Sequence, residues 1–189
     1  KVLTDPYFYD LWQEANDLDM AVCIHIGSGI PNLKANRTAS GSNRVPFASL
    51  PDAFTSLVLN KIPQRYPSIR WGFIEGASGW VPHELYKFGR RLGHPAAQQR
   101  SDGLLTRDDL PQGFDINRDA LKEFNLFVTC QVDEDLPYIL QFTGEDNLVV
   151  GSDYTHADQS MERNFQDVLR ARVEAGDLTA VALGKMLYD

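Results

Sequence analysis

The segment Asn147-Leu-Val-Val-Gly-Ser-Asp-Tyr-Thr-His-Ala-Asp158 joins an apolar run of strand length directly to two polar clusters. Gly, Ser and Asp are depleted inside strands, so Gly151-Ser152-Asp153 marks the point where a strand leaves its sheet. In parallel α/β folds, ligands bind at the carboxyl ends of the strands. Asp153 and His156 therefore form a candidate metal or acid/base site at such an edge.

The rest of the chain repeats the pattern of strand followed by helix. Strands are expected at 21–27, 69–76, 125–131 and 147–151. Helices are expected at 5–19, 50–62, 80–92, after Asp135, at 160–175 and at 177–187, with 93–117 as a polar connection. This alternation predicts a parallel sheet with right-handed crossovers, in a single α/β domain spanning 1–189.

Composition restricts the class of protein. A net charge of −8 argues against a nucleic-acid partner, because phosphate binding needs a basic surface. No apolar run approaches the roughly 18 residues that cross a bilayer, so no membrane partner is expected. Cys23 and Cys130 both lie in apolar runs and are expected to be reduced core residues of a cytoplasmic protein.

The first expected strand has two different faces. Alternation places Val22, Ile24 and Ile26 on one face and Cys23, His25 and Gly27 on the other. In a parallel barrel the first set would pack against outer helices and the second would point inward. His25 is then either a metal ligand or a core histidine with a satisfied hydrogen bond.

Polar residues end three of the four expected strands: His25, Glu75 and Asp153. His25 and Asp153 are suitable ligands for Zn²⁺ or Mn²⁺. Two ligands do not complete a site, because a catalytic zinc usually takes three protein ligands and keeps one position for water. Glu75 either joins the chemistry as metal ligand or acid/base, or accepts hydrogen bonds from its own turn.

Several further residues are weaker candidates. Arg37 and Arg44, in the long loop 27–46, could bind a substrate carboxylate with two hydrogen bonds, or be solvated loop charges. Trp80 either lines a substrate pocket or packs against the core. His156 either contacts substrate and supports Asp153 in catalysis, or is a solvated loop histidine.

Three ordered motifs resemble the amidohydrolase-related (amidohydrolase 2) family: Ala21-Val-Cys-Ile-His-Ile-Gly-Ser28, Arg65-Tyr-Pro-Ser-Ile-Arg-Trp-Gly-Phe-Ile-Glu-Gly-Ala-Ser-Gly-Trp-Val-Pro82 and Gly144-Glu-Asp-Asn-Leu-Val-Val-Gly-Ser-Asp-Tyr-Thr-His156. The branch includes aminocarboxymuconate-semialdehyde, resorcylate and carboxyvanillate decarboxylases. The resemblance implies a distorted (β/α)₈ TIM-type barrel with one divalent metal, zinc first and manganese second. His25 falls on a metal-binding His of the family and Asp153 on its last-strand Asp.

The resemblance also implies that two ligands are missing. The family's first-strand His-x-His or Glu-x-His pair has no counterpart here, so the chain is expected to be the C-terminal half of a barrel. A homodimer is expected by analogy with the family.

Glu75 is the departure that bears on the reaction, because the decarboxylases carry a His at this position. It favours a hydrolase that acts on a small carboxylated or cyclic organic substrate through a metal-activated water, with Asp153, Glu75 and His156 as catalytic residues. A metal-dependent decarboxylase of an aromatic or unsaturated acid is the alternative. A metal-free hydrolase using Asp153 and His156, and a non-catalytic barrel relative, remain open.

Overall fold

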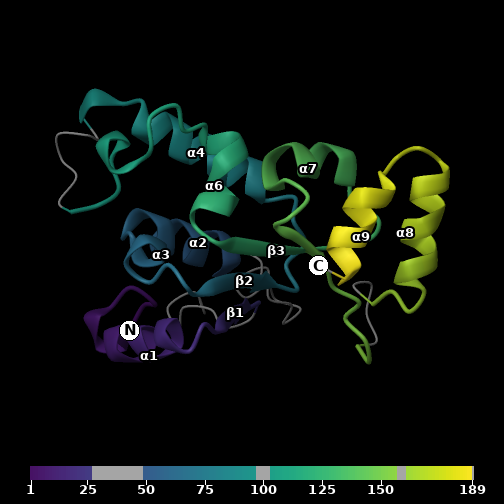
Figure 1. Cartoon of the computed structure of the whole chain (residues 1–189), viewed down its shortest axis with the longest axis horizontal. Coiled ribbons are helices and arrows are strands. Elements are labelled where there is room, and N and C mark those ends of the chain that lie inside the picture. Colours follow the sequence, from purple (N-terminus) through teal and green to yellow (C-terminus); the bar gives the residue numbers. More distant parts are fainter. Residues whose placement is uncertain (27–48, 97–102, 157–160, 189) are drawn as a thin grey trace, which may run out of the picture.

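The computed structural model describes residues 1–26, 49–96, 103–156 and 161–188 (Figure 1). Four strands form a single sheet in this part of the chain: β1 (Ala21–His25), β2 (Arg70–Ile74), β3 (Leu126–Cys130) and β4 (Leu148–Val150). Their spatial order is the order in the sequence, and each neighbouring pair is parallel. The four predicted strands and their parallel pairing are confirmed.

Helices connect and cover the strands. They are the short 3₁₀ helix η1 (Pro6–Phe8), α1 (Tyr9–Asp17), α2 (Ser49–Leu59), α3 (Ile62–Arg65), α4 (Val81–Leu92), the 3₁₀ turn η4 (Arg107–Asp109), α6 (Ile116–Glu123), α7 (Leu136–Thr143), α8 (Phe165–Glu174) and α9 (Ala180–Tyr188). Figure 1 shows α4, α6 and α7 along one side of the sheet, with α8 and α9 at the right of the view. Each strand therefore passes to the next through helical structure, as parallel pairing requires.

Helix α6 is the α-helix that the sequence did not reveal among the described residues. Its start lies inside the segment expected to be a polar connection, and its sequence Ile-Asn-Arg-Asp-Ala-Leu-Lys-Glu buries only Ala120 and Leu121. The Asp115 carboxylate caps the helix by accepting a hydrogen bond from the Asn117 amide at 3.0 Å. The apolar stripe is too narrow to stand out as a helical period, so packing against neighbouring helices decides this element.

The core lies between the sheet and the helices. Phe73 and Trp71 on β2 are fully buried, and register aligns Phe73 with Ile24 on β1 and with Val128 on β3. One buried cluster unites β1, β2 and β3 with α1, α2, α4 and α6. A second cluster joins the ends of β3 and β4 to α7, α8 and α9.

The two faces of β1 differ as predicted. Ile24 is buried, and Val22 and Ile26 pack against the core. Cys23 and His25 lie on the opposite face and are exposed. The expectation that both cysteines are core residues is therefore wrong for Cys23, because alternation along β1 turns it away from the helices. Cys130 is buried as expected, and both thiols are free.

None of the described helices is long and apolar enough to cross a membrane.

Candidate metal centre at the strand ends

Two carboxylates stand where β2 and β4 leave the sheet. Glu75 directly follows β2 with a φ of 67°, and Asp153 follows β4 with a φ of 46°. Residues other than Gly seldom adopt this left-handed region, and it costs free energy wherever it occurs. Such conformations concentrate at functional sites, where the surrounding structure holds them in place.

Thr129, on the intervening strand β3, fixes the turn at Glu75. The Glu75 backbone N–H donates to Thr129 Oγ1 at 3.0 Å, and the same hydroxyl donates to the Phe73 carbonyl at 3.2 Å. The hydroxyl thus takes the place of a ladder hydrogen bond where β2 ends. Thr129 is buried, so this link is shielded from water. Its signal in the sequence was a single Thr inside an apolar strand, which by itself indicates nothing.

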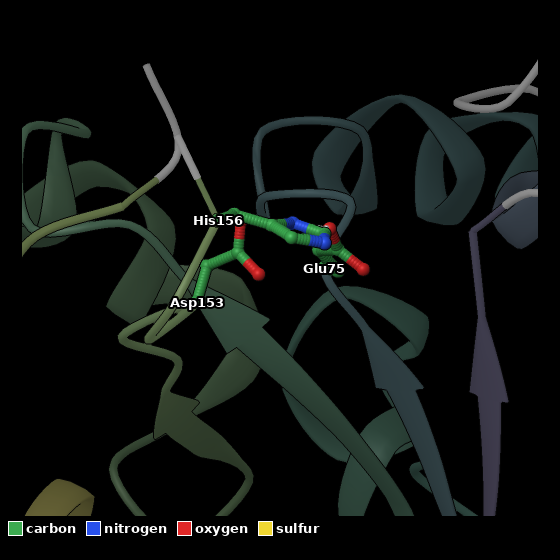
Figure 2. A group of neighbouring side chains, drawn as sticks. All are labelled: Glu75, Asp153 and His156. Atoms are coloured by element: carbon green, nitrogen blue, oxygen red, sulfur yellow. Dashed lines mark hydrogen bonds and ion pairs between the residues drawn. The ribbon is translucent and has the colours of Figure 1, made fainter. Parts of the chain in front are cut away.

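The two carboxylates meet at His156. His156 Nδ1 lies 2.8 Å from Asp153 Oδ2 and 3.2 Å from Glu75 Oε1. Figure 2 shows the imidazole reaching from the β4 side toward Glu75, with the Asp153 carboxylate beneath it. One potential ligand atom from each of these three residues lies within 4.8 Å of the others. The predicted strand-end residues therefore do come together.

His25 joins the same group from β1. Its Nε2 makes an ion-pair contact with Glu75 Oε2, while its Nδ1 lies 2.8 Å from the Ile26 carbonyl oxygen. A carbonyl can only accept, so Nδ1 carries a proton and donates to it. Nε2 is then the nitrogen that faces the carboxylate. A histidine held through Nδ1 by a backbone carbonyl, with Nε2 turned to the site, is a common arrangement for a metal ligand.

Glu75 is the centre of the group and fits a metal ion. Its side chain is 11% exposed, and both of its ion pairs within the described residues are with histidines. Oε2 is buried, and the contact that it makes within that part of the chain is with His25 Nε2. A buried carboxylate oxygen needs a proton, a donor or a cation. Two carboxylates and two imidazoles form a donor set that suits Zn²⁺ or Mn²⁺.

The other predicted site residues lie elsewhere. The Trp80 ring packs edge-on against Phe54 and Phe73 at centroid distances of 5.4 and 5.7 Å, and its Nε1 donates to the Ala77 carbonyl. These contacts place Trp80 against the core at the start of α4, and a role in substrate binding stays a prediction. Arg37 and Arg44 fall outside the described residues.

Glu134 is a carboxylate that the sequence did not single out. Its side chain accepts hydrogen bonds from the backbone of Ser78, Gly79 and Gln131, so it joins the loop after β2 to the loop after β3. In the sequence it stands between Asp133 and Asp135, and Asp135 caps α7 by accepting a hydrogen bond from the Tyr138 amide. No periodicity distinguishes these three acidic neighbours.

The similarity of this chain to known proteins lies in its structure. No family model matches the sequence, and no curated protein matches it. An amidohydrolase from Mycobacterium avium subsp. paratuberculosis K-10 superposes with a TM-score of 0.70 at 16% identity, covering 98% of this chain and 44% of its own. A 5-carboxyvanillate decarboxylase from Sphingomonas paucimobilis gives 0.67 at 14% identity, covering 98% and 52%.

A third similar structure contains a metal. A dihydroxybenzoic acid decarboxylase from Polaromonas sp. JS666, with bound manganese and the inhibitor 2-nitroresorcinol, gives a TM-score of 0.64 at 13% identity. It is matched over 98% of this chain and 52% of its own. The chain thus spans about half the length of the solved structures that it matches. It carries the α/β fold of the amidohydrolase-type barrels over that length, as the motifs predicted.

Proposed function

We propose that this protein is a metal-dependent hydrolase that acts on a small carboxylated or cyclic organic substrate. The observation that carries the proposal is Glu75, whose two oxygens face His25 and His156 from a nearly buried position. A carboxylate so placed among imidazoles, at the carboxyl ends of parallel strands, is positioned to hold a cation.

The residues that would hold the ion are His25 through Nε2, Asp153 and Glu75, with His156 beside them. A divalent zinc ion would supply Lewis acidity and lower the pKa of a coordinated water from about 15.7 to roughly 7. This is the chemistry that attack on an ester, amide or lactone requires near neutral pH. The donor set accommodates both zinc and manganese. Zinc is our first choice and manganese the second.

The chain's own residues would handle the protons. His156 Nδ1 is 2.8 Å from Asp153 Oδ2, so an N–H at this position orients the carboxylate by donating to it. As the water oxygen bonds to the carbonyl carbon, its proton passes to the Asp153 carboxylate. When the bond to the leaving group breaks, the same proton passes to the leaving atom. Asp153 thus acts as general base and then as general acid.

Metal analysis of the intact protein, purified without chelator, tests this proposal. We expect stoichiometric zinc or manganese in the wild type, and its loss in His25→Ala, Asp153→Ala and Glu75→Gln. Asp133→Asn is the matched control, because Asp133 is an exposed carboxylate beyond β3. Metal-free wild-type protein, or activity that survives complete chelation, would overturn the proposal.

A decarboxylase is the second candidate. The observation in its favour is the similarity in fold to decarboxylases of 5-carboxyvanillate and dihydroxybenzoate. Here Asp153, protonated from solvent, would give its proton to the ring carbon that bears the carboxylate. As the C–C bond breaks and CO₂ leaves, the electron pair of that bond forms the new C–H bond. Assays of the metal-loaded protein that score CO₂ release and hydrolysis on the same carboxylated aromatic esters separate the two reactions.

A further inference from the structure

The Glu134 side chain collects donors from two loops at the carboxyl edge of the sheet. Oε1 accepts from the Ser78 and Gly79 amides at 2.9 and 2.8 Å. Oε2 accepts from the Ser78 hydroxyl at 2.9 Å and from the Gln131 amide at 2.8 Å. Ser78 is completely buried. Hydrogen bonds to an ionised acceptor are roughly twice as strong as neutral ones, so this carboxylate is a substantial link between the loops.

The loop that Glu134 holds begins with Glu75 and is strained. Glu75 has a φ of 67° and Ala77 a φ of 54°, so two of its first three residues adopt the left-handed region without being Gly. Such a backbone persists only where contacts outside the segment hold it. Thr129 holds the Glu75 amide at 3.0 Å, and Glu134 holds Ser78 and Gly79 a few residues later. The two anchors bracket the turn that aims the Glu75 carboxylate.

The backbone that carries Glu134 is held in turn by a side chain of α8. Arg172 on α8 donates through Nη1 to the Val132 and Glu134 carbonyls, each at 2.7 Å. Arg172 also pairs with Asp177, and its side chain is mostly buried. The backbone that carries Glu134 therefore has a rigid support on the helix that follows β4. A carboxylate with such support can hold a strained loop in one conformation.

We propose that Glu134 is a positioning residue, which sets the orientation of Glu75 by locking the loop 75–80 and so sets metal affinity. This inference rests on the proposed metal centre, because it assigns Glu75 to that centre. Glu134 does not touch the reacting atoms in this assignment. It acts through the backbone of Ser78 and Gly79.

Three variants of the intact protein test this assignment. Glu134→Gln replaces one acceptor oxygen with an NH₂ group that cannot accept from the loop amides, which leaves buried donors unpaired. Ser78→Ala is a milder change, because it removes only the hydroxyl and keeps both backbone donors. Asp133→Asn removes an exposed carboxylate one residue away and is the control.

Two readouts are needed: amide hydrogen exchange of the 75–80 segment without metal, and Mn²⁺ or Zn²⁺ affinity by calorimetry. For Glu134→Gln we expect faster exchange at Ser78 and Gly79 and about 10- to 100-fold weaker metal binding, the range seen when residues supporting a ligand are lost. Ser78→Ala should give smaller changes in the same direction, and Asp133→Asn should match the wild type.

Unchanged amide exchange in Glu134→Gln would show that Glu134 does not hold the loop 75–80, which we call the Glu134 clamp. Faster exchange with unchanged metal affinity would show that this clamp does not set the orientation of Glu75. If Glu134→Gln does not fold, Ser78→Ala decides by the same two criteria. Wild-type protein that binds no metal would refute the proposed function instead, while the exchange measurement would still report on the clamp. The two failures are therefore distinguishable.

Discussion

Glu75 Oε1 and His156 Nδ1 lie 3.2 Å apart, although their strands β2 and β4 are separated by β3. The short distance arises because Glu75 and Asp153 both leave the sheet in the left-handed conformation, and His156 follows Asp153 closely. The same Nδ1 atom also faces Asp153 at 2.8 Å. A single imidazole nitrogen thus lies between two carboxylates, an arrangement that either a proton or a metal ion stabilises.

The nitrogen that His25 presents to the site can be tested by substitution. A Gln side chain places its terminal group near the position of Nε2, whereas Asn reaches only the position of Nδ1. Since Nδ1 is used by the Ile26 carbonyl, we expect metal affinity to decrease in the order wild type, His25→Gln, His25→Asn. The loss for Asn should be about 10- to 100-fold or more by titration calorimetry. The reverse order would assign the metal to Nδ1.

At Glu75 the left-handed backbone should make a Gly variant more stable than an Ala variant, the opposite of the order expected in a helix. Both Glu75→Gly and Glu75→Ala remove the carboxylate, but only Gly relieves the left-handed conformation at φ 67°. We expect Glu75→Gly to have the higher free energy of unfolding, by about 1 kcal/mol in urea denaturation.

Glu123, the exposed last residue of α6, supplies the control for that pair. There Glu123→Ala should be more stable than Glu123→Gly by about 0.5–1 kcal/mol, because Gly weakens a helix. If the Ala variant were the more stable one at both positions, the backbone turn at Glu75 would not be strained.

Two glycines of the loop after β2 should respond differently to Ala. A Cβ at Gly76 would overlap Leu50 Cδ1 in the core and lie 3.2 Å from Ile26 Cγ2, so Gly76→Ala should cost about 1–3 kcal/mol. Among the described residues, a Cβ at Gly79 meets only Glu134 Oε1, at 3.5 Å, so Gly79→Ala should be neutral or stabilise by about 0.4–1 kcal/mol. Thermal unfolding of the two variants compares them directly. Equal melting temperatures would contradict the tight packing at Gly76.

The two thiols should differ in reactivity. Burial, together with the nearby Glu134 carboxylate, raises the pKa of Cys130 from 9.0 to about 12. Because the thiolate is the nucleophile, iodoacetamide at pH 8 should alkylate exposed Cys23 and spare Cys130 until the protein unfolds. Peptide mass spectrometry reports both sites. Alkylation of folded Cys130 at a rate similar to Cys23 would show that the second core cluster opens readily.

The same shift has a defined pH dependence. The folded state favours the neutral thiol, so this contribution to stability is complete below pH 9 and is lost as pH rises toward 12. Cys130→Ser removes this titration, so its free energy of unfolding should fall less steeply between pH 9 and 12 than that of Cys23→Ser, and its alkaline midpoint should differ. Identical alkaline midpoints for the two variants would argue against the raised pKa.

The sequence by itself determined the strands, their parallel order and the ends at which polar residues stand, because short apolar runs and their polar boundaries are local signals. It also determined the two faces of β1, since alternation has a fixed period. It did not reveal α6, which buries only two residues, or the exposure of Cys23, whose face lacks a helix layer among the described residues.

Only the tertiary structure decided how the centre is assembled. The meeting of Glu75 with both His25 and His156 depends on the conformation of two turns, and neither turn has a Gly or Pro signal at the carboxylate itself. The anchors Thr129 and Glu134 act across 54 and 56 positions of the chain, respectively. Local sequence specifies which residues can reach the edge of the sheet, but contacts between distant segments determine where they point there.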